Sequence, residues 1–386
     1  MNRTETKQRE GKAVGLFPEL LGVGGIQEAS RQTVRALQNI LTRRHWAGAY
    51  LGLNDPQGEQ ALAFDGLSIP LLGFSRSKIK FVLQALRLAR QNPRIVVAAH
   101  PNLAVPARWM KKVSPATKTI VLCHGVEVWK PLHRRRRAAL LAADVVLAPS
   151  TYTAEKLRSA QGVGAEKIRV IPWPIGTEML KLSENSSNLP LPKGFPAGRV
   201  ILTVGRWAAA ERYKGVDNLV RAMPQLLIPF PDLQLVAVGG GDDLPRLKTI
   251  AAELGVTSSV HFLEGISRRH LAACYARAEI FALPSTGEGF GIVFLEAMAF
   301  SLPVVGAPAG GVTDLVQDEV NGLLVPRAGV PALVETLSRI LRDPAFGSKL
   351  GQRGAQIIQQ KYQSAAFEHK LEAILIDGGL DSTPAA

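Results

Sequence analysis

The chain has 386 residues, 46% of them hydrophobic and 20% charged, which is typical of a soluble globular protein with room for two hydrophobic cores. No apolar run reaches the roughly 18 residues of a membrane-spanning helix, and the polar segment Met1 to Lys12 predicts a loose tail without a secretory signal. The two cysteines, Cys123 and Cys274, are too few for a disulfide framework or a zinc site and favour a reducing, cytoplasmic location.

The positive charge is confined to the first half of the chain. Residues 1–175 contain 27 Lys and Arg against 11 Asp and Glu, whereas residues 176–386 contain 19 against 21, so the net charge of +14 belongs to the first half. A basic half commonly meets an anionic membrane, a nucleic acid or an acidic acceptor. The alternative is a solvated basic surface that only maintains solubility.

The first half predicts a parallel sheet with helices on both faces. Ala13 to Phe17 is an apolar strand, 22–25 a glycine turn, and Ile26 to Leu41 a helix with apolar residues at three- and four-residue spacing. Further short buried strands are predicted at Ile95–Ala99, Thr119–Cys123, Val145–Ala148 and Ile168–Pro172.

The second half repeats this pattern after an irregular connection. Trp173 to Arg199 is rich in Pro, Ser and Asn, has no clear period, and predicts the link between domains. Strands are then predicted at Val200–Val204, Leu233–Val238, Val260–Phe262, Ile280–Leu283, Pro303–Gly306 and Gly322–Val325. The fold class is therefore α/β, with two doubly wound, Rossmann-like domains that face each other across a cleft at the carboxyl ends of their strands.

A pair of glutamates marks a candidate site in the second half. A strand ends at Pro284, a glycine-flanked turn contains Glu288, and an apolar helix follows with Glu296 about two turns on, near the same face. One carboxylate could then reach a sugar while the other reaches a ribose. Two acids at this spacing also occur on ordinary exposed helices.

The segment from Pro284 to Ala299 resembles the donor-site signature of family 4 retaining glycosyltransferases, which have the two-domain GT-B fold. Three further segments resemble the same family in the same order: Gly24-Gly25-Ile26-Gln27, His124-Gly125-Val126-Glu127-Val128-Trp129, and Gly205-Arg206 followed by Tyr213-Lys214-Gly215. The resemblance extends over about residues 12–360 and is strongest over 200–330. It implies transfer of a hexose from a nucleoside-diphosphate sugar to an acceptor hydroxyl with the anomeric configuration kept, in cell-surface glycan, exopolysaccharide or glycolipid synthesis.

The resemblance also implies a division of the chain. The expected parts are a flexible tail over 1–11, an N-terminal acceptor-side domain over 12–175 and a C-terminal nucleotide-sugar-binding domain over 176–360. A helix over 361–377 is expected to cross back to the N-terminal domain, and 378–386 is expected to be a frayed tail.

Departure of the diphosphate is the difficult step of this reaction, so cations aimed at the leaving oxygen should contribute most to catalysis. The resemblance assigns that role to Arg206 and Lys214, although the interval between them is long and Arg212 could substitute. Otherwise, Arg206 is a surface arginine and Lys214 a solvated lysine.

The remaining roles follow from the same resemblance. Glu288 would accept hydrogen bonds from sugar hydroxyls and Glu296 would hold the ribose. The N–H groups of Phe290, Gly291 and Ile292 would contact the sugar or the phosphate.

In the first domain, His124 would face the donor, although a single histidine at a strand end is otherwise structural. Gly24 and Gly25 would let a loop approach the diphosphate. His100 is expected to be structural.

No cofactor or metal is expected. The nucleotide sugar is a substrate; it could be linked to GDP or UDP, and mannose is slightly favoured as the sugar. An Asp-x-Asp pair at a strand end is missing, and Asp242-Asp243 is expected to cap a helix. Retention by double displacement needs a carboxylate nucleophile, and Glu288 is the only candidate. Because the resemblance assigns Glu288 to binding sugar hydroxyls, a same-face displacement is favoured.

The helical stretch Ser75 to Gln91 predicts a membrane footprint. Ile79, Val82, Leu83, Leu86 and Ala89 form a predicted apolar stripe beside Arg76, Lys80, Arg87 and Arg90, and Arg108 to Lys112 and Arg134 to Arg137 add further positive clusters. The partners would then be a sugar or lipid-linked acceptor and an anionic membrane, with a peripheral location on its inner face. Alternatively, the stripe packs in the core.

Two other function classes remain open. A nucleotide-sugar epimerase or hydrolase could share the fold. A basic nucleic-acid-binding protein would need aromatic residues interleaved with Lys and Arg, and the tryptophans here are dispersed, so no nucleic acid is expected.

Overall fold

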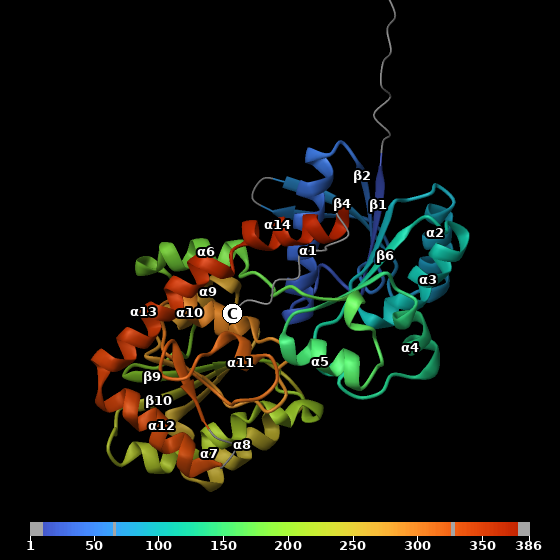
Figure 1. The fold of residues 1–386 in the computed structure, drawn as a ribbon. Helices are drawn as coiled ribbons and strands as arrows, with labels where there is room; N and C mark the ends of the chain where they lie inside the picture. The colour runs from blue at the N-terminus through green and yellow to red at the C-terminus, as the bar shows by residue number, and fades with distance from the viewer. Residues whose placement is uncertain (1–10, 65–66, 326–328, 377–386) are drawn as a thin grey trace, which may run out of the picture. The chain divides into compact units, whose positions relative to one another are not determined.

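The computed structural model describes residues 11–64, 67–325 and 329–376, and the chain divides into two compact units (Figure 1). The first unit runs to Pro172 and includes the residues from Ala365 onward, whereas the second comprises Trp173 to Ser364. Apart from Gly11, the tails predicted over 1–11 and 378–386 lie outside the described residues.

An eight-stranded sheet forms the centre of the first unit. Its strand order is β3-β4-β2-β1-β5-β6-β7-β8, and every neighbouring pair is parallel except β3 and β4. The strands are β1 (Lys12–Phe17), β2 (Ala47–Gly52), β3 (Gly58–Phe64), β4 (Leu67–Gly73), β5 (Ile95–Ala98), β6 (Lys118–Leu122), β7 (Val145–Ala148) and β8 (Ile168–Val170).

The strands predicted for this half are confirmed, but β2, β3 and β4 were not predicted. The predicted parallel sheet also has an antiparallel pair at this edge, where Phe64 of β3 pairs with Leu67 of β4. The physical reason for the missed prediction is that edge strands are half exposed: β3 is buried only at Leu62, so it lacks the continuous apolar run of the central strands.

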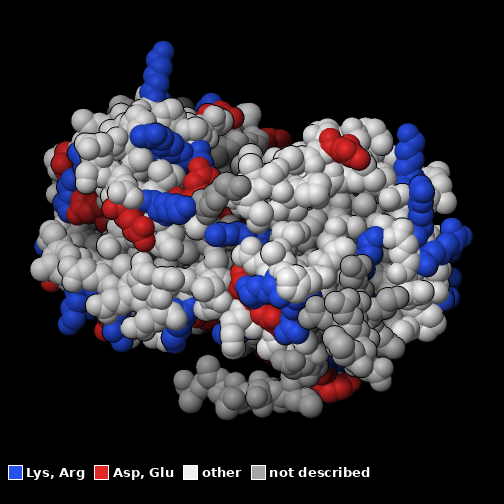
Figure 2. All heavy atoms as spheres, turned by 90° about the horizontal axis from the view of Figure 1, so that it is seen from above, with Lys and Arg blue, Asp and Glu red and all other residues white. Residues whose placement is uncertain are grey.

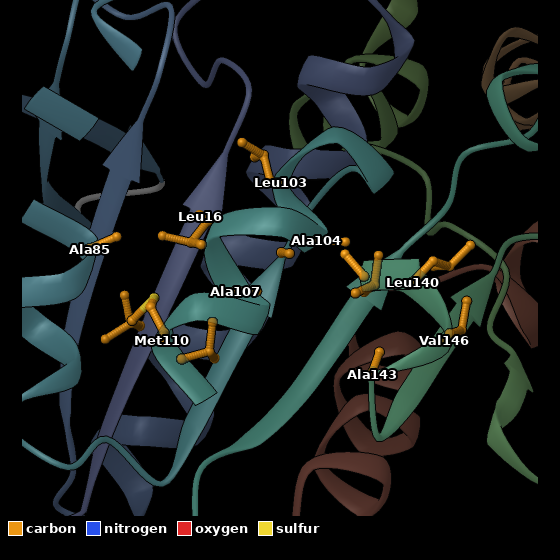
Figure 3. Close-up of a cluster of buried hydrophobic side chains, with 14 of the residues drawn as sticks. Leu16, Ala85, Leu103, Ala104, Ala107, Met110, Leu140, Ala143 and Val146 are labelled. Atoms are coloured by element: carbon orange, nitrogen blue, oxygen red, sulfur yellow. The ribbon is translucent and has the colours of Figure 1, made fainter. Parts of the chain in front are cut away.

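Helices pack on both faces of this sheet. They are α1 (Gly25–Arg43), α2 (Lys78–Ala89), α3 (Ala104–Val113), α4 (Arg134–Leu141), α5 (Thr151–Ser159) and α14 (Ser364–Ile376), with short 3-10 turns η1 (Pro101–Leu103), η2 (Val126–Val128) and η3 (Ala165–Lys167). Figure 3 shows side chains of β1, α2, α3, α4 and β7 converging in one core cluster, among them Leu16, Ala85, Met110, Leu140 and Val146.

The second unit contains a six-stranded, fully parallel sheet of order β11-β10-β9-β12-β13-β14. Its strands are β9 (Arg199–Val204), β10 (Leu233–Val238), β11 (Val260–Leu263), β12 (Ile280–Leu283), β13 (Val304–Gly306) and β14 (Gly322–Leu324). All six were predicted. The order reverses between β9 and β12, so a ligand-binding crevice is expected at the carboxyl ends of these two strands.

The helices of the second unit are α6 (Thr177–Glu184), α7 (Val216–Leu227), α8 (Leu244–Glu253), α9 (Arg268–Arg277), α10 (Ile292–Ala299), α11 (Val312–Leu315), α12 (Val330–Arg342) and α13 (Pro344–Lys361), with turns η4 (Ser186–Asn188), η5 (Ala209–Lys214) and η6 (Thr257–Ser259). Helices α7 to α11 lie between successive strands, whereas α6 precedes β9 and both α12 and α13 follow β14. The link predicted over 173–199 contains a helix that was not predicted, α6, which buries Met179 against neighbouring helices.

Helix α14 belongs to the first unit from Ala365 onward. It buries Phe367 and Leu371, and its acids Glu368 and Glu372 form ion pairs with Arg43, the last residue of α1, and with Arg44, which follows it. In the ranges that the structure describes, no helix combines the length and the apolar character needed to cross a membrane.

Candidate active site

The reversal in strand order brings two segments of the second unit together. One follows β9 and contains Arg206 and Lys214, and the other follows β12 and contains Glu288. A backbone hydrogen bond of 2.8 Å from the Thr286 N–H to the Tyr213 carbonyl joins them. The sequence-predicted residues of these two motifs therefore lie at one edge of one sheet.

Gly215 makes this close approach possible. Its φ is 70°, in the left-handed region that favours glycine, and a β-carbon there would lie 2.7 Å from the Pro284 carbonyl oxygen. A side chain at residue 215 would push the β12 turn away from Lys214. Packing against the β12 turn therefore requires a glycine at residue 215.

Arg206 and Lys214 are linked through a carboxylate that sequence analysis did not single out. Glu211, in η5, forms ion pairs with the Arg206 guanidinium and, through Oε2, with Lys214 Nζ at 3.1 Å. The Lys214 and Glu211 side chains are only 16% and 14% exposed, whereas Arg206 is 71% exposed. Burial lowers the pKa of Lys214, the carboxylate of Glu288 raises it, and the guanidinium of Arg206 lowers it.

Arg212 does not join this cluster. Its guanidinium pairs with Asp243 at 3.0 Å, and Arg246 binds the same carboxylate at 2.6 Å. Asp243 occupies the N-cap position of α8, as predicted, but its side chain makes no capping hydrogen bond. The reason is that two guanidiniums compete for the carboxylate and hold the pKa of Asp243 below its usual range.

Glu288 lies in the turn between β12 and α10. Desolvation raises the pKa of this carboxyl, and the nearby ammonium of Lys214 opposes that shift. The backbone turns through Gly291, whose φ of 97° is again in the left-handed region, and α10 starts at Ile292. The N–H groups of Phe290, Gly291 and Ile292 therefore lie in this turn or at the first residue of α10, as the sequence predicts.

Glu296 is buried in α10, and its polar partners include Tyr275 and Arg268. The hydroxyl of Tyr275 donates to Glu296 Oε2 at 3.0 Å, and Arg268 Nη2 lies 3.6 Å from Oε1. Arg268 also pairs with Glu178 at 3.5 Å. Tyr275 and Arg268 both belong to α9, and Glu178 belongs to α6; sequence reasoning did not find these contacts.

In the first unit, the candidate glycines lie at the tip of the loop between β1 and α1. Gly24 has a φ of 149° and Gly25 begins α1. The buried carboxylate of Asp55 accepts hydrogen bonds from the Leu20 and Leu21 N–H groups at 2.8 to 3.1 Å and thereby fixes the loop. Val23 at the tip is 97% exposed, which leaves this loop open to a ligand.

His124 follows β6 and is buried. Its ring Nε2 lies 2.7 Å from the Ala99 carbonyl oxygen, and its backbone N–H donates to the Glu127 carboxylate. His100, which follows β5, stacks on it with ring centroids 6.1 Å apart. Burial lowers the pKa of His100 to about 4, partly opposed by Glu127, so His100 is neutral at physiological pH. His100, which was expected to be structural, therefore packs directly against His124, the predicted site residue.

The predicted stripe on α2 is divided between two faces. Phe81, Ala85, Leu88 and Ala89 are buried in the core, whereas Ile79 and Leu83 are 76% and 63% exposed. The prediction of one continuous apolar stripe was wrong, because some apolar residues of α2 pack in the core while Ile79 and Leu83 face solvent.

The exposed α2 residues lie near further exposed side chains on α3. We define the basic face as Arg76, Ile79, Lys80, Leu83, Arg87, Arg90, Arg108, Trp109 and Lys112, all exposed on or next to these two packed helices. In Figure 2, Lys and Arg side chains gather along the right-hand edge, the side on which α2 and α3 lie in Figure 1.

Acidic and sulfur ligands do not gather into a metal cluster in the described ranges: no group of three or more His, Cys, Asp or Glu could hold an ion there. The positive charges near the carboxyl end of β9 include the side chains of Arg206 and Lys214.

Comparisons with known proteins identify the architecture. The fold resembles that of a sucrose-phosphate synthase from Thermosynechococcus elongatus, with a TM-score of 0.74 and 23% identity over 94% of this chain and 98% of that one. The two parallel-sheet units have the GT-B fold of glycosyltransferases.

The particular family follows from sequence. The model described as Glycosyltransferase Family 4 matches residues 23–179, and the model described as Glycosyl transferases group 1 matches residues 193–357. The chain belongs to glycosyltransferase family 4.

Several curated relatives carry the same name, GDP-mannose-dependent alpha-(1-6)-phosphatidylinositol monomannoside mannosyltransferase. The one from Mycolicibacterium smegmatis is 33% identical over 62% of this chain, and the match spans 65% of that relative. The one from Mycobacterium tuberculosis is 30% identical over 68% of this chain and 71% of the relative.

Proposed function

We propose that this protein transfers a hexose, with mannose the best-supported sugar, from a nucleoside-diphosphate donor to an acceptor hydroxyl with retention of configuration and without a metal ion. The observation that carries the proposal is the cation pair Arg206 and Lys214 beside Glu288 at the reversal of strand order in the second unit. Membership of family 4 and the GDP-mannose-dependent names of two relatives support the donor class.

The chemistry assigns a task to each cation. As the bond between the anomeric carbon and the phosphate oxygen breaks, negative charge develops on that oxygen, and Arg206 and Lys214 stabilise it. The acceptor oxygen bonds to the anomeric carbon on the same face, and its proton passes to the departing phosphate. No carboxylate nucleophile is needed, which leaves Glu288 to bind sugar hydroxyls.

The other site residues bind the rest of the donor. Glu296 is proposed to accept hydrogen bonds from the ribose hydroxyls, with Tyr275 and Arg268 fixing its orientation. In the first unit, His124 and the loop at Gly24 and Gly25 are the residues proposed to contact the donor. The N–H groups of Phe290, Gly291 and Ile292 are proposed to contact the sugar or the phosphate.

A nucleotide panel tests the donor class. We expect GDP to raise the melting temperature of the purified protein more than UDP or ADP, because a ligand that binds only the folded state stabilises it. Thermal shift at equal ligand concentrations measures this. Stabilisation by UDP alone would change the donor to a UDP-hexose, and no stabilisation by any nucleoside diphosphate would contradict the donor site.

The basic face is proposed to bring the enzyme to an anionic lipid surface that holds a lipid-linked acceptor. Ile79, Leu83 and Trp109 are exposed among Lys and Arg side chains, a combination suited to the headgroup region of a bilayer. Each basic side chain contributes at most about 1 kcal/mol near an anionic leaflet, so docking should be reversible and salt-sensitive. Two relatives are named for a phosphatidylinositol-linked acceptor, which supports the same choice.

Liposome sedimentation checks this docking. We expect binding to vesicles that contain anionic lipid but not to neutral vesicles, loss of binding at high salt, and at least a several-fold loss when Arg76, Lys80 and Arg87 are replaced by Glu. Reversal of Arg221, Lys248 and Arg353 in the second unit gives the same charge change and should have a much smaller effect. Absence of binding to both vesicle types at low salt would leave a soluble acceptor.

A further inference from the structure

Glu211 lies between the two cations that the proposed function assigns to the diphosphate. One carboxylate oxygen pairs with Arg206 and the other with Lys214 Nζ, at 3.1 Å in the latter case. Its backbone interrupts the helical conformation of η5, with φ −117° and ψ 26°. The residue therefore departs from regular geometry at the point where its side chain spans both cations.

The Arg206 guanidinium and the Lys214 ammonium both pair with Glu211, so these two positive charges lie near each other and repel. Burial disfavours the charged form of Lys214, and the guanidinium of Arg206 disfavours it further. A carboxylate between them offsets both effects, because it attracts each cation and compensates the desolvated ammonium. Glu288 also faces Lys214, but it is proposed to bind the sugar, whereas Arg212 is committed to Asp243.

We propose that Glu211 is a positioning residue, whose carboxylate holds the Arg206 guanidinium and the Lys214 ammonium together as one diphosphate-binding unit. The inference rests on the proposed function, because it assumes that these cations bind diphosphate. Exposed Arg206 can pivot from Glu211 towards an incoming phosphate, while the less exposed Glu211–Lys214 pair stays in place. Glu211 then acts through the cations and does not itself contact the donor.

A free nucleoside diphosphate is the right probe, because it carries the full charge that the leaving group develops during transfer. We expect Glu211→Gln to weaken binding of the stabilising nucleoside diphosphate roughly three- to tenfold, between the effects typical of exposed and of buried ion pairs. Binding of the corresponding monophosphate should change less. Isothermal titration calorimetry on the full chain measures both.

The pH dependence separates positioning from a merely structural role. Loss of the negative charge should make Lys214 easier to deprotonate, so nucleoside-diphosphate binding should weaken at a lower alkaline pH in Glu211→Gln than in the unmodified protein. Glu211→Asp keeps the charge on a shorter side chain and should restore most of the pH profile.

A matched control comes from the opposite edge of the same sheet. Glu279 pairs with Arg199 at 2.5 Å where β9 and β12 begin, and its side chain is also partly buried. Glu279→Gln should lower stability without changing diphosphate affinity or its pH profile.

The outcomes distinguish the two proposals. If Lys214→Ala weakens diphosphate binding but Glu211→Gln binds as tightly as the unmodified protein, or more tightly, with an unchanged pH profile, the positioning role is wrong and the donor site stands. If neither variant affects diphosphate binding, both proposals fail.

Discussion

Replacing Lys214 by alanine is expected to reduce turnover about a hundredfold, with a smaller loss of donor affinity. The ammonium is desolvated and lies at the carboxyl end of β9, where it can stabilise charge that develops on the leaving diphosphate. An interaction that strengthens as the bond breaks lowers the barrier more than it stabilises the bound donor. Removal of one preorganised donor of this kind typically costs about a hundredfold to a thousandfold in rate.

Steady-state kinetics with a saturating acceptor measures this effect. Lys248→Ala provides the control, because Lys248 is an exposed lysine of the same unit. Burial lowers the pKa of Lys214, so turnover of the unmodified enzyme should fall with rising pH earlier than for an ordinary lysine. Turnover of Lys214→Ala close to that of the unmodified enzyme would contradict the assignment.

The two glutamates should separate binding from turnover. Glu296→Ala is expected to weaken donor binding roughly tenfold to a hundredfold, since a hydrogen bond to a charged group contributes about 1.5 to 3 kcal/mol. Glu288→Gln should mainly lower turnover, because the sugar changes its charge at the reacting centre while the ribose does not. Donor dissociation constants and single-turnover rates for each variant measure the split.

The burial of Glu296 calls for a structural control in that experiment. Its loss also leaves Tyr275 and Arg268 without a shared carboxylate, so some of the effect could come from stability. Tyr275→Phe removes the hydroxyl contact but keeps Glu296, and it should weaken donor binding less than Glu296→Ala. Equal effects in both variants would argue that Glu296 serves the packing of α9 and α10.

The central strands could be predicted because parallel strands buried on both faces are continuous apolar runs. Ile280–Leu283 is one such run, and the turn after it contains Glu288 together with several glycines. The hairpin of β3 and β4 could not be predicted in the same way, because half-exposed edge strands lack that signal. Helix α6 was missed because its polar residues and the surrounding prolines mask its short apolar face.

The candidate site was predictable as motifs but not as contacts. Arg206, Lys214 and Glu288 stand in recognisable local patterns, whereas Glu211 is a single acid beside basic residues and is typical of a solvated surface. Its importance depends on where its carboxylate lies, and only the folded chain defines that. The same holds for Tyr275, which is distant in sequence from its partner Glu296.

The stereochemistry of sugar transfer in the presence of a chelator tests the central claim most directly. The enzyme is incubated with GDP-mannose, EDTA and phosphatidylinositol monomannoside, the acceptor class named for its relatives, and the anomeric configuration of the product is followed by proton NMR. We predict transfer at an undiminished rate with the configuration of the donor retained. An inverted product, or activity that EDTA abolishes and magnesium or manganese restores, would contradict the account.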